Sequence, residues 1–135
     1  MNDTTIISAF PGCGKTYASG LYGIPDLDRR EYYIQPDWVD RYIERIRGDV
    51  VFIIQRPELL RRITGAIMVA PYPELKDEWL EKRILARGYK PEWFDLVADN
   101  WDILTSDRYF MQFAPKEIIR LGIDEYISDI IGRLL

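Results

Sequence analysis

The segment that decides the fold is a glycine-rich octapeptide near the start of the chain, Ala9-Phe10-Pro11-Gly12-Cys13-Gly14-Lys15-Thr16. It fits the phosphate-binding pattern A/G-x-x-x-x-G-K-S/T, with Ala9 at the position where the strictest form has glycine. The residues before it, 4–9, form a β-branched and apolar run typical of a buried strand, and residues 15–21 have the pattern of a helix. Phosphate binding requires this strand–loop–helix context.

Each part of the octapeptide has a chemical reason to be there. Two glycines let successive backbone N–H groups turn inward around a phosphate, and the N-terminus of the following helix adds its dipole. Lys15 is expected to reach the β- and γ-phosphates of a nucleotide, and Thr16 Oγ1 to ligate Mg²⁺. We therefore expect ATP with Mg²⁺ to be bound by the loop residues Pro11, Gly12, Cys13, Gly14, Lys15 and Thr16.

The cysteine and histidine content limits the chemistry. Cys13 is the only cysteine and there is no histidine, which excludes an intramolecular disulfide, the usual zinc sites and histidine-based nucleophilic triads. A thiolate beside a helix N-terminus can have a lowered pKa. The sequence favours the simpler interpretation of Cys13, a small residue at an unconstrained loop position.

Composition indicates one globular domain with no bulk attraction to polyanions. The chain has 135 residues, 47% of them hydrophobic and 30% charged, which suits a single domain with a real core. A net charge of −4 disfavours general binding to nucleic acid or to an anionic membrane. The apolar runs are too short to span a bilayer, so we expect a cytoplasmic protein that does not bind membranes.

Strand-like runs alternate with helical patterns along the rest of the chain. Residues 50–54, 66–70 and 117–121 are apolar runs of strand length, and 24–28 is a short segment that ends in acidic residues. Helices are expected at 38–46, 57–63, 74–87, 91–104 and 124–134. This alternation predicts an α/β domain with a parallel sheet of four or five strands.

With the octapeptide, the short length and an arginine-bearing helix in place, the chain resembles the adenylate kinase-like branch of P-loop kinases. The closest likeness is to small phage and bacterial proteins of that branch. The specific part covers residues 6–16, with weaker echoes at 26–28, 75–88 and 126–129. The resemblance implies a P-loop NTPase three-layer α/β/α sandwich over residues 1–135, with a helical lid-like segment at about 74–88.

The resemblance also implies roles for acidic residues after the second strand. In that family such a residue handles the phosphoryl acceptor or the metal, which by position implicates Asp28 first and Asp26 second. A carboxylate there can take the proton of an acceptor hydroxyl or hold Mg²⁺. The run at 50–54 ends in Gln55-Arg56, where a Walker B acid usually stands, and Asp28 is the candidate to supply the missing metal contact.

The family closes a lid whose arginines neutralise charge on the transferred phosphoryl group. Arg83 and Arg87 are four residues apart and therefore share a face of the expected helix. The competing interpretation is a solvated helix, because the acidic residues between 74 and 81 offer ordinary surface ion pairs.

The leading hypothesis is a kinase that moves the γ-phosphoryl group of ATP to a small nucleotide acceptor, such as a (deoxy)nucleoside monophosphate. The first alternative is a DNA kinase acting on a hydroxymethylated base in phage DNA, which the arginine-rich stretch 29–62 permits and the overall acidity disfavours. The second is a non-kinase NTP-binding switch or ATPase module, in which Gln55 positions water.

Overall fold

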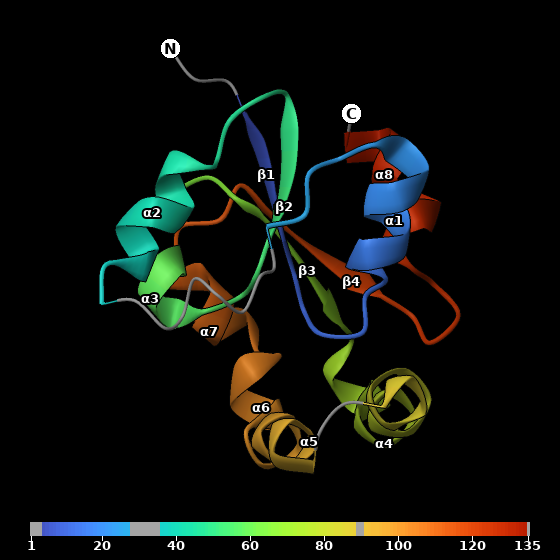
Figure 1. The fold of residues 1–135 in the computed structure, drawn as a ribbon. Coiled ribbons are helices and arrows are strands. Elements are labelled where there is room, and N and C mark those ends of the chain that lie inside the picture. The colour runs from blue at the N-terminus through green and yellow to red at the C-terminus, as the bar shows by residue number, and fades with distance from the viewer. Residues whose placement is uncertain (1–3, 28–35, 89–90, 135) are drawn as a thin grey trace.

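The fold is built on a four-stranded sheet, seen in a computed structural model that describes residues 4–27, 36–88 and 91–134. The strands, in spatial order, are β2 (Val50–Ile53), β1 (Thr5–Ala9), β3 (Ile67–Pro71) and β4 (Glu117–Leu121). All three neighbouring pairs are parallel. The predicted α/β class and parallel sheet are confirmed (Figure 1).

The short acidic segment continues the sheet beyond β2. Asp26 forms a parallel bridge with Phe52. The two neighbours of Asp26 make its hydrogen bonds: Leu27 N donates to Phe52 O (3.2 Å), and Pro25 O accepts from Phe52 N (2.9 Å). The expected segment at 24–28 therefore lies beside β2, as far as the described residues extend.

Helices lie on both sides of the sheet, an arrangement compatible with three layers. α1 (Lys15–Tyr22) and α8 (Ile127–Leu134) lie on one side, and α2 (Trp38–Glu44) and α3 (Pro57–Leu60) lie on the other (Figure 1). Every residue of β3 is buried, as expected for a central parallel strand covered on both faces. In the part of the chain that the structure describes, no helix is both long and apolar enough to cross a membrane.

The expected helix at 74–87 is replaced by four short pieces of different pitch. A 3₁₀ turn (η2, Pro73–Leu75) leads into α4 (Lys76–Trp79), which continues as a π-helical turn (η3, Leu80–Ile84) and a 3₁₀ turn (η4, Leu85–Arg87). Gly88, with φ 74°, ends the segment. The buried residues of this segment pack under the loop that follows β1, and that packing overrides the uniform helix propensity of the sequence.

Three other features of the helices differ from the expectation for local reasons. The helix expected at 91–104 divides into α5 (Pro91–Asp99) and α6 (Trp101–Leu104), because the side chain of Asn100 bonds back to Leu96 O (2.8 Å) and competes with the helix backbone. α8 begins at Ile127 rather than at 124, because Gly122 N is bonded to the Glu125 carboxylate in a preceding turn (2.7 Å). α7 (Asp107–Met111) was not expected; Ser106 caps it by accepting from Tyr109 N (3.1 Å).

Topology singles out one place at the edge of the sheet. The chain leaves β1 toward β2 on one side and leaves β3 toward β4 on the other. The carboxyl ends of β1 and β3 therefore form a switch point, where ligands of open α/β sheets bind. The octapeptide leaves β1 at this point, and α4, α5 and α6 lie beyond the same edge (Figure 1).

Candidate functional site

The loop between β1 and α1 requires glycine at two positions. Gly12 and Gly14 have φ values of 90° and 86°, which side-chain-bearing residues rarely adopt. A Cβ on Gly14 would lie 2.9 Å from Tyr126 Cδ1, and a Cβ on Gly12 would lie 3.0 Å from both Trp79 Nε1 and Arg83 Cβ. The backbone conformation and the lack of space therefore both require glycine at positions 12 and 14.

Three consecutive carbonyls of this loop are held from outside by two other segments, residues 73–87 and the start of α8. Each accepts one hydrogen bond: Pro11 O from Trp79 Nε1 (2.9 Å), Gly12 O from Arg83 Nη1 (3.2 Å) and Cys13 O from Ile127 N (2.9 Å). In a trans peptide the C=O and the following N–H point in opposite directions. The outward carbonyls therefore turn the N–H groups of Gly12 and Gly14 to the other side of the loop, while Cys13 N closes a turn onto Phe10 O (3.2 Å).

Loops whose N–H groups face one side can act as anion-binding nests. Gly14 is also the N-cap of α1, whose first turn contains no acidic residue to oppose the helix dipole. Lys15 and Thr16 are the first two residues of α1, and the Thr16 side chain is exposed. The loop, the helix N-terminus and Lys15 together can hold a polyphosphate.

The loop lysine is paired with the acidic segment. Lys15 Nζ lies 3.2 Å from Asp26 Oδ1, and the two side chains are only 12% and 17% exposed. Asp28, the carboxylate that the sequence favoured, lies outside the described residues. Asp26, the second choice, is thus the carboxylate that the structure places at the loop.

One side-chain oxygen at the loop, the hydroxyl of Thr16, fits a magnesium site. Within residues 4–27, 36–88 and 91–134, no three His, Cys, Asp or Glu side chains come close enough to hold a metal ion. Mg²⁺ in nucleotide sites is usually held by phosphates and one or two protein oxygens. The exposed hydroxyl of Thr16 is such an oxygen, in the first turn of the helix that follows the loop.

Arg83 has a different environment from the one expected of a lid residue. It is 2% exposed, and its guanidinium lies between the rings of Trp79 (4.2 Å) and Tyr126 (3.7 Å). Besides Gly12 O, it donates to three further carbonyls, those of Gly122 (3.5 Å), Ile123 (2.5 Å) and Glu125 (2.5 Å). Burial lowers the pKa of Arg83. In this structure the side chain lies behind the loop, bonded to backbone, and is not free to swing over a phosphate.

The structure does not bring Arg83 and Arg87 together on one described face. The backbone of Arg87 ends the 3₁₀ turn before Gly88, and its side chain lies outside the description. A helical turn of changed pitch separates the two residues, so the four-residue spacing does not carry the meaning it has in a regular α-helix.

Cys13 is buried within the loop. Its side chain is 1% exposed and its Sγ donates to Val69 O at 3.8 Å. Burial raises the pKa of the thiol to about 12, so the neutral form dominates at physiological pH. This environment favours the structural interpretation of Cys13 over the activated thiolate.

Gln55 ties the two strands of the switch point together. Its amide nitrogen donates to Ser8 O (2.9 Å) in β1 and to Val69 O (3.2 Å) in β3. The amide NH₂ group is therefore bonded to the backbone of the sheet.

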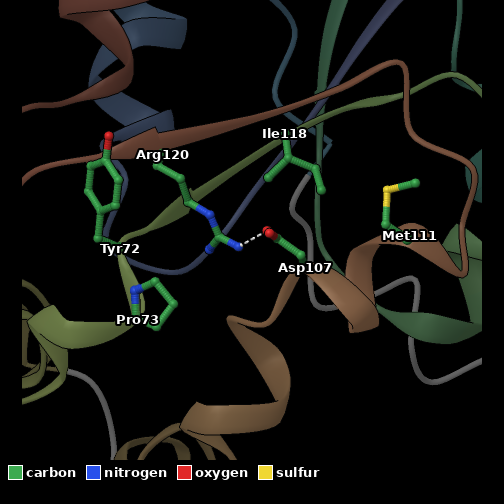
Figure 2. A pocket seen from close by; sticks show the side chains of 6 residues that line it. All are labelled: Tyr72, Pro73, Asp107, Met111, Ile118 and Arg120. Atoms are coloured by element: carbon green, nitrogen blue, oxygen red, sulfur yellow. Dashed lines mark hydrogen bonds and ion pairs between the residues drawn. The ribbon is translucent and has the colours of Figure 1, made fainter.

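A hollow lies away from the loop, beside β4. It has a volume of about 570 Å³, and six residues line it: Tyr72, Pro73, Asp107, Met111, Ile118 and Arg120. Figure 2 shows the Arg120 guanidinium extending across it to Asp107 (2.5 Å). The same guanidinium donates to Pro71 O (2.9 Å). None of the expected site residues that the structure describes lines this hollow.

Sequence reasoning missed Trp79 and Tyr126 as parts of the site. A signal for Trp79 was present, because positions 79, 80, 83 and 84 form one face at helical spacing, and Arg83 lies on that face with apolar residues. No protein-family model matches the chain, and no curated protein matches it. The functional assignment therefore depends on the geometry of the loop.

Proposed function

We propose that this chain is a P-loop kinase that binds Mg·ATP at residues 11–16 and transfers the γ-phosphoryl group to a small nucleotide acceptor. A (deoxy)nucleoside monophosphate is the proposed acceptor, and the cytoplasm the proposed compartment. The observation that carries the proposal is the set of outward carbonyls at Pro11, Gly12 and Cys13, which presets the loop for an anion. The finer fold assignment, a P-loop α/β/α sandwich of the adenylate kinase-like branch, belongs to the same proposal.

ATP binding follows from the charges at the loop. Backbone N–H groups and the α1 dipole surround the β-phosphate, and Lys15 provides the side-chain cation. Mg²⁺, when bound, neutralises charge on the phosphates, and Thr16 with a carboxylate of Asp26 or Asp28 would hold it. The loop lies at the switch point of the sheet, where the nucleotides of such folds bind.

Transfer needs a positioned acceptor oxygen and neutralised charge. An oxygen of the acceptor's phosphate forms a bond to the γ-phosphorus, the bond from that phosphorus to the β–γ bridging oxygen breaks, and ADP leaves. The second pKa of a phosphate monoester is about 6, so the attacking oxygen carries no proton that must be removed at neutral pH. A carboxylate would instead orient the acceptor or hold Mg²⁺, and Asp26 and Asp28 are the candidates. The ion pair between Asp26 and Lys15 supports this proposal, because it puts a carboxylate beside the group that holds the γ-phosphate. Arg87 remains the proposed side chain that neutralises charge on the transferring group.

A transfer screen with ATP labelled at the γ-phosphate tests the proposal. The acceptors are nucleosides, nucleoside monophosphates, single-stranded DNA and double-stranded DNA, each with Mg²⁺. We expect label in a nucleoside monophosphate product and none with Lys15→Ala. Label in DNA would establish the DNA kinase alternative, and release of labelled phosphate at an equal rate with and without every acceptor would establish the ATPase module.

A further inference from the structure

We propose that Arg83 and Trp79 are positioning residues that set the conformation of the phosphate loop from behind. This inference depends on the proposed nucleotide binding for its effect on ligands, but its structural part concerns the loop alone. It replaces the direct phosphate contact that the sequence suggested for Arg83.

The environment of Arg83 indicates a role in shaping backbone. Burying a guanidinium is costly unless its donors are satisfied. Among the residues that the structure describes, no carboxylate lies within ion-pair distance of Arg83; four carbonyl oxygens and two aromatic rings surround it instead. A buried cation that donates its hydrogen bonds to backbone carbonyls fixes the orientation of those peptides.

One of those peptides belongs to the loop, and Trp79 holds the peptide before it. The bond to Gly12 O orients the peptide between residues 12 and 13, and the Trp79 Nε1 bond to Pro11 O orients the preceding one. Rotation of either peptide would turn a carbonyl oxygen toward the phosphates, where it repels them. Trp79 and Arg83 therefore favour the one loop conformation that binds an anion.

The same guanidinium joins the loop to a second segment. Arg83 holds the carbonyls of Ile123 and Glu125, while Ile127 N donates to Cys13 O. The phosphate loop and the turn before α8 are thus connected by bonds in both directions. A substitution at Arg83 is expected to loosen both segments.

Positioning and direct contact predict different ligand dependence. The nest surrounds the β-phosphate, which ADP and ATP share, so a loosened loop weakens both nucleotides by the same factor. A lid arginine that touches the γ-phosphoryl group affects ATP and leaves ADP unchanged. Comparing the two nucleotides therefore separates the roles.

The experiment is calorimetric titration of Mg·ADP and Mg·ATP into wild type, Arg83→Met, Arg83→Lys and Trp79→Phe. Arg83→Met and Trp79→Phe are each expected to weaken both nucleotides equally, by about tenfold. Arg83→Lys should restore part of the loss, since it keeps the charge but not the planar fork of donors. Trp79→Phe keeps a ring against Arg83 and loses only the N–H, so it carries the test if Arg83→Met does not fold.

Arg120→Met is the matched control. Arg120 is also largely buried and also donates to a backbone carbonyl, that of Pro71, but it lies at the hollow beside β4. Its loss should leave both affinities unchanged. A loss confined to Mg·ATP in the Arg83 variants, or unchanged affinities in both Arg83→Met and Trp79→Phe, would overturn the positioning role.

Amide hydrogen exchange without nucleotide tests the structural part independently. The amides of Cys13 and Ile127, bonded to Phe10 O and Cys13 O, should exchange faster in Arg83→Met and Trp79→Phe than in wild type and Arg120→Met. Unchanged exchange would contradict the positioning role. If wild type bound neither nucleotide, the proposed function would fail, and the exchange rates would still decide the role of Arg83.

Discussion

Lys15 Nζ and Asp26 Oδ1 lie 3.2 Å apart at the carboxyl edge of the sheet. Both side chains are mostly removed from water, so the pair is worth more than an exposed one. A phosphate that binds the loop must share Lys15 with this carboxylate. The charge on Asp26 therefore opposes nucleotide binding even where the carboxylate would orient the acceptor or the metal for transfer.

Asp26→Asn is expected to change affinity and transfer in opposite directions. Removing the charge leaves Lys15 without this competing anion, so Mg·ATP should bind as tightly as before or up to about tenfold more tightly. Loss of the carboxylate that orients the acceptor or the metal should lower the transfer rate by about 100-fold. Calorimetry and the labelled transfer assay measure the two effects.

Asp40→Asn provides the control for that change. Asp40 pairs with Arg62 at 2.9 Å, but both side chains are more than half exposed, and such pairs contribute little. Neither affinity nor transfer should move. Weaker Mg·ATP binding in Asp26→Asn, with transfer unaffected, would mean that Asp26 only supports the loop.

Gly14→Ala should destabilise the protein and weaken nucleotide binding. Alanine at φ 86° is strained, at a cost of about 1–3 kcal/mol, and its Cβ would collide with Tyr126. Gly20→Ala is the matched control within α1, where no atom lies within 4 Å of the added Cβ. It should stabilise the fold by about 0.5–1 kcal/mol. Denaturant unfolding measures both, and a stable Gly14→Ala with normal affinity is the contrary result.

The buried thiol of Cys13 should make the free energy of unfolding decrease as the pH rises above 9. Burial raises the pKa of its thiol from 9.0 to about 12. Above pH 9 the unfolded chain loses this proton while the folded chain keeps it, so the stability from the neutral thiol is complete below pH 9 and is lost as pH rises toward 12. Relative to Cys13→Ala, wild type should lose about 1.4 kcal/mol of unfolding free energy per pH unit in this window. If the unfolding free energies of the two proteins change in parallel with pH, the raised pKa of the buried thiol is contradicted.

The sheet was predictable because its strands are written as apolar runs. β4 was found at its observed bounds. The run at 50–54 is one residue longer than β2, and the run at 66–70 is shifted by one residue from β3. A short run that is apolar throughout indicates a strand buried on both faces rather than a helix. Strand order was not in the pattern, because it depends on how the connections cross the sheet.

The site was predictable only where a motif fixes the backbone. The strand, glycine-rich loop and helix around residues 9–16 were predicted because the motif specifies that backbone context. The position of Arg83 was not, because charge suggested a solvated or lid residue, whereas its apolar neighbours Trp79, Leu80 and Ile84 draw that face into the core. The π-helical turn and the break at Asn100 likewise come from tertiary and side-chain bonds that local propensity does not contain.

The most direct test of the account is titration of Mg·ATP into wild type, Lys15→Ala and Lys116→Ala. Lys15 is the side-chain cation of the loop, whereas Lys116 is exposed and precedes β4 at the opposite end of the sheet. We expect Lys15→Ala to bind about tenfold to hundredfold more weakly, the loss of a charged hydrogen bond, and Lys116→Ala to match wild type. Equal affinity in all three proteins, or no binding by wild type, would contradict the assignment of residues 11–16 as the nucleotide site.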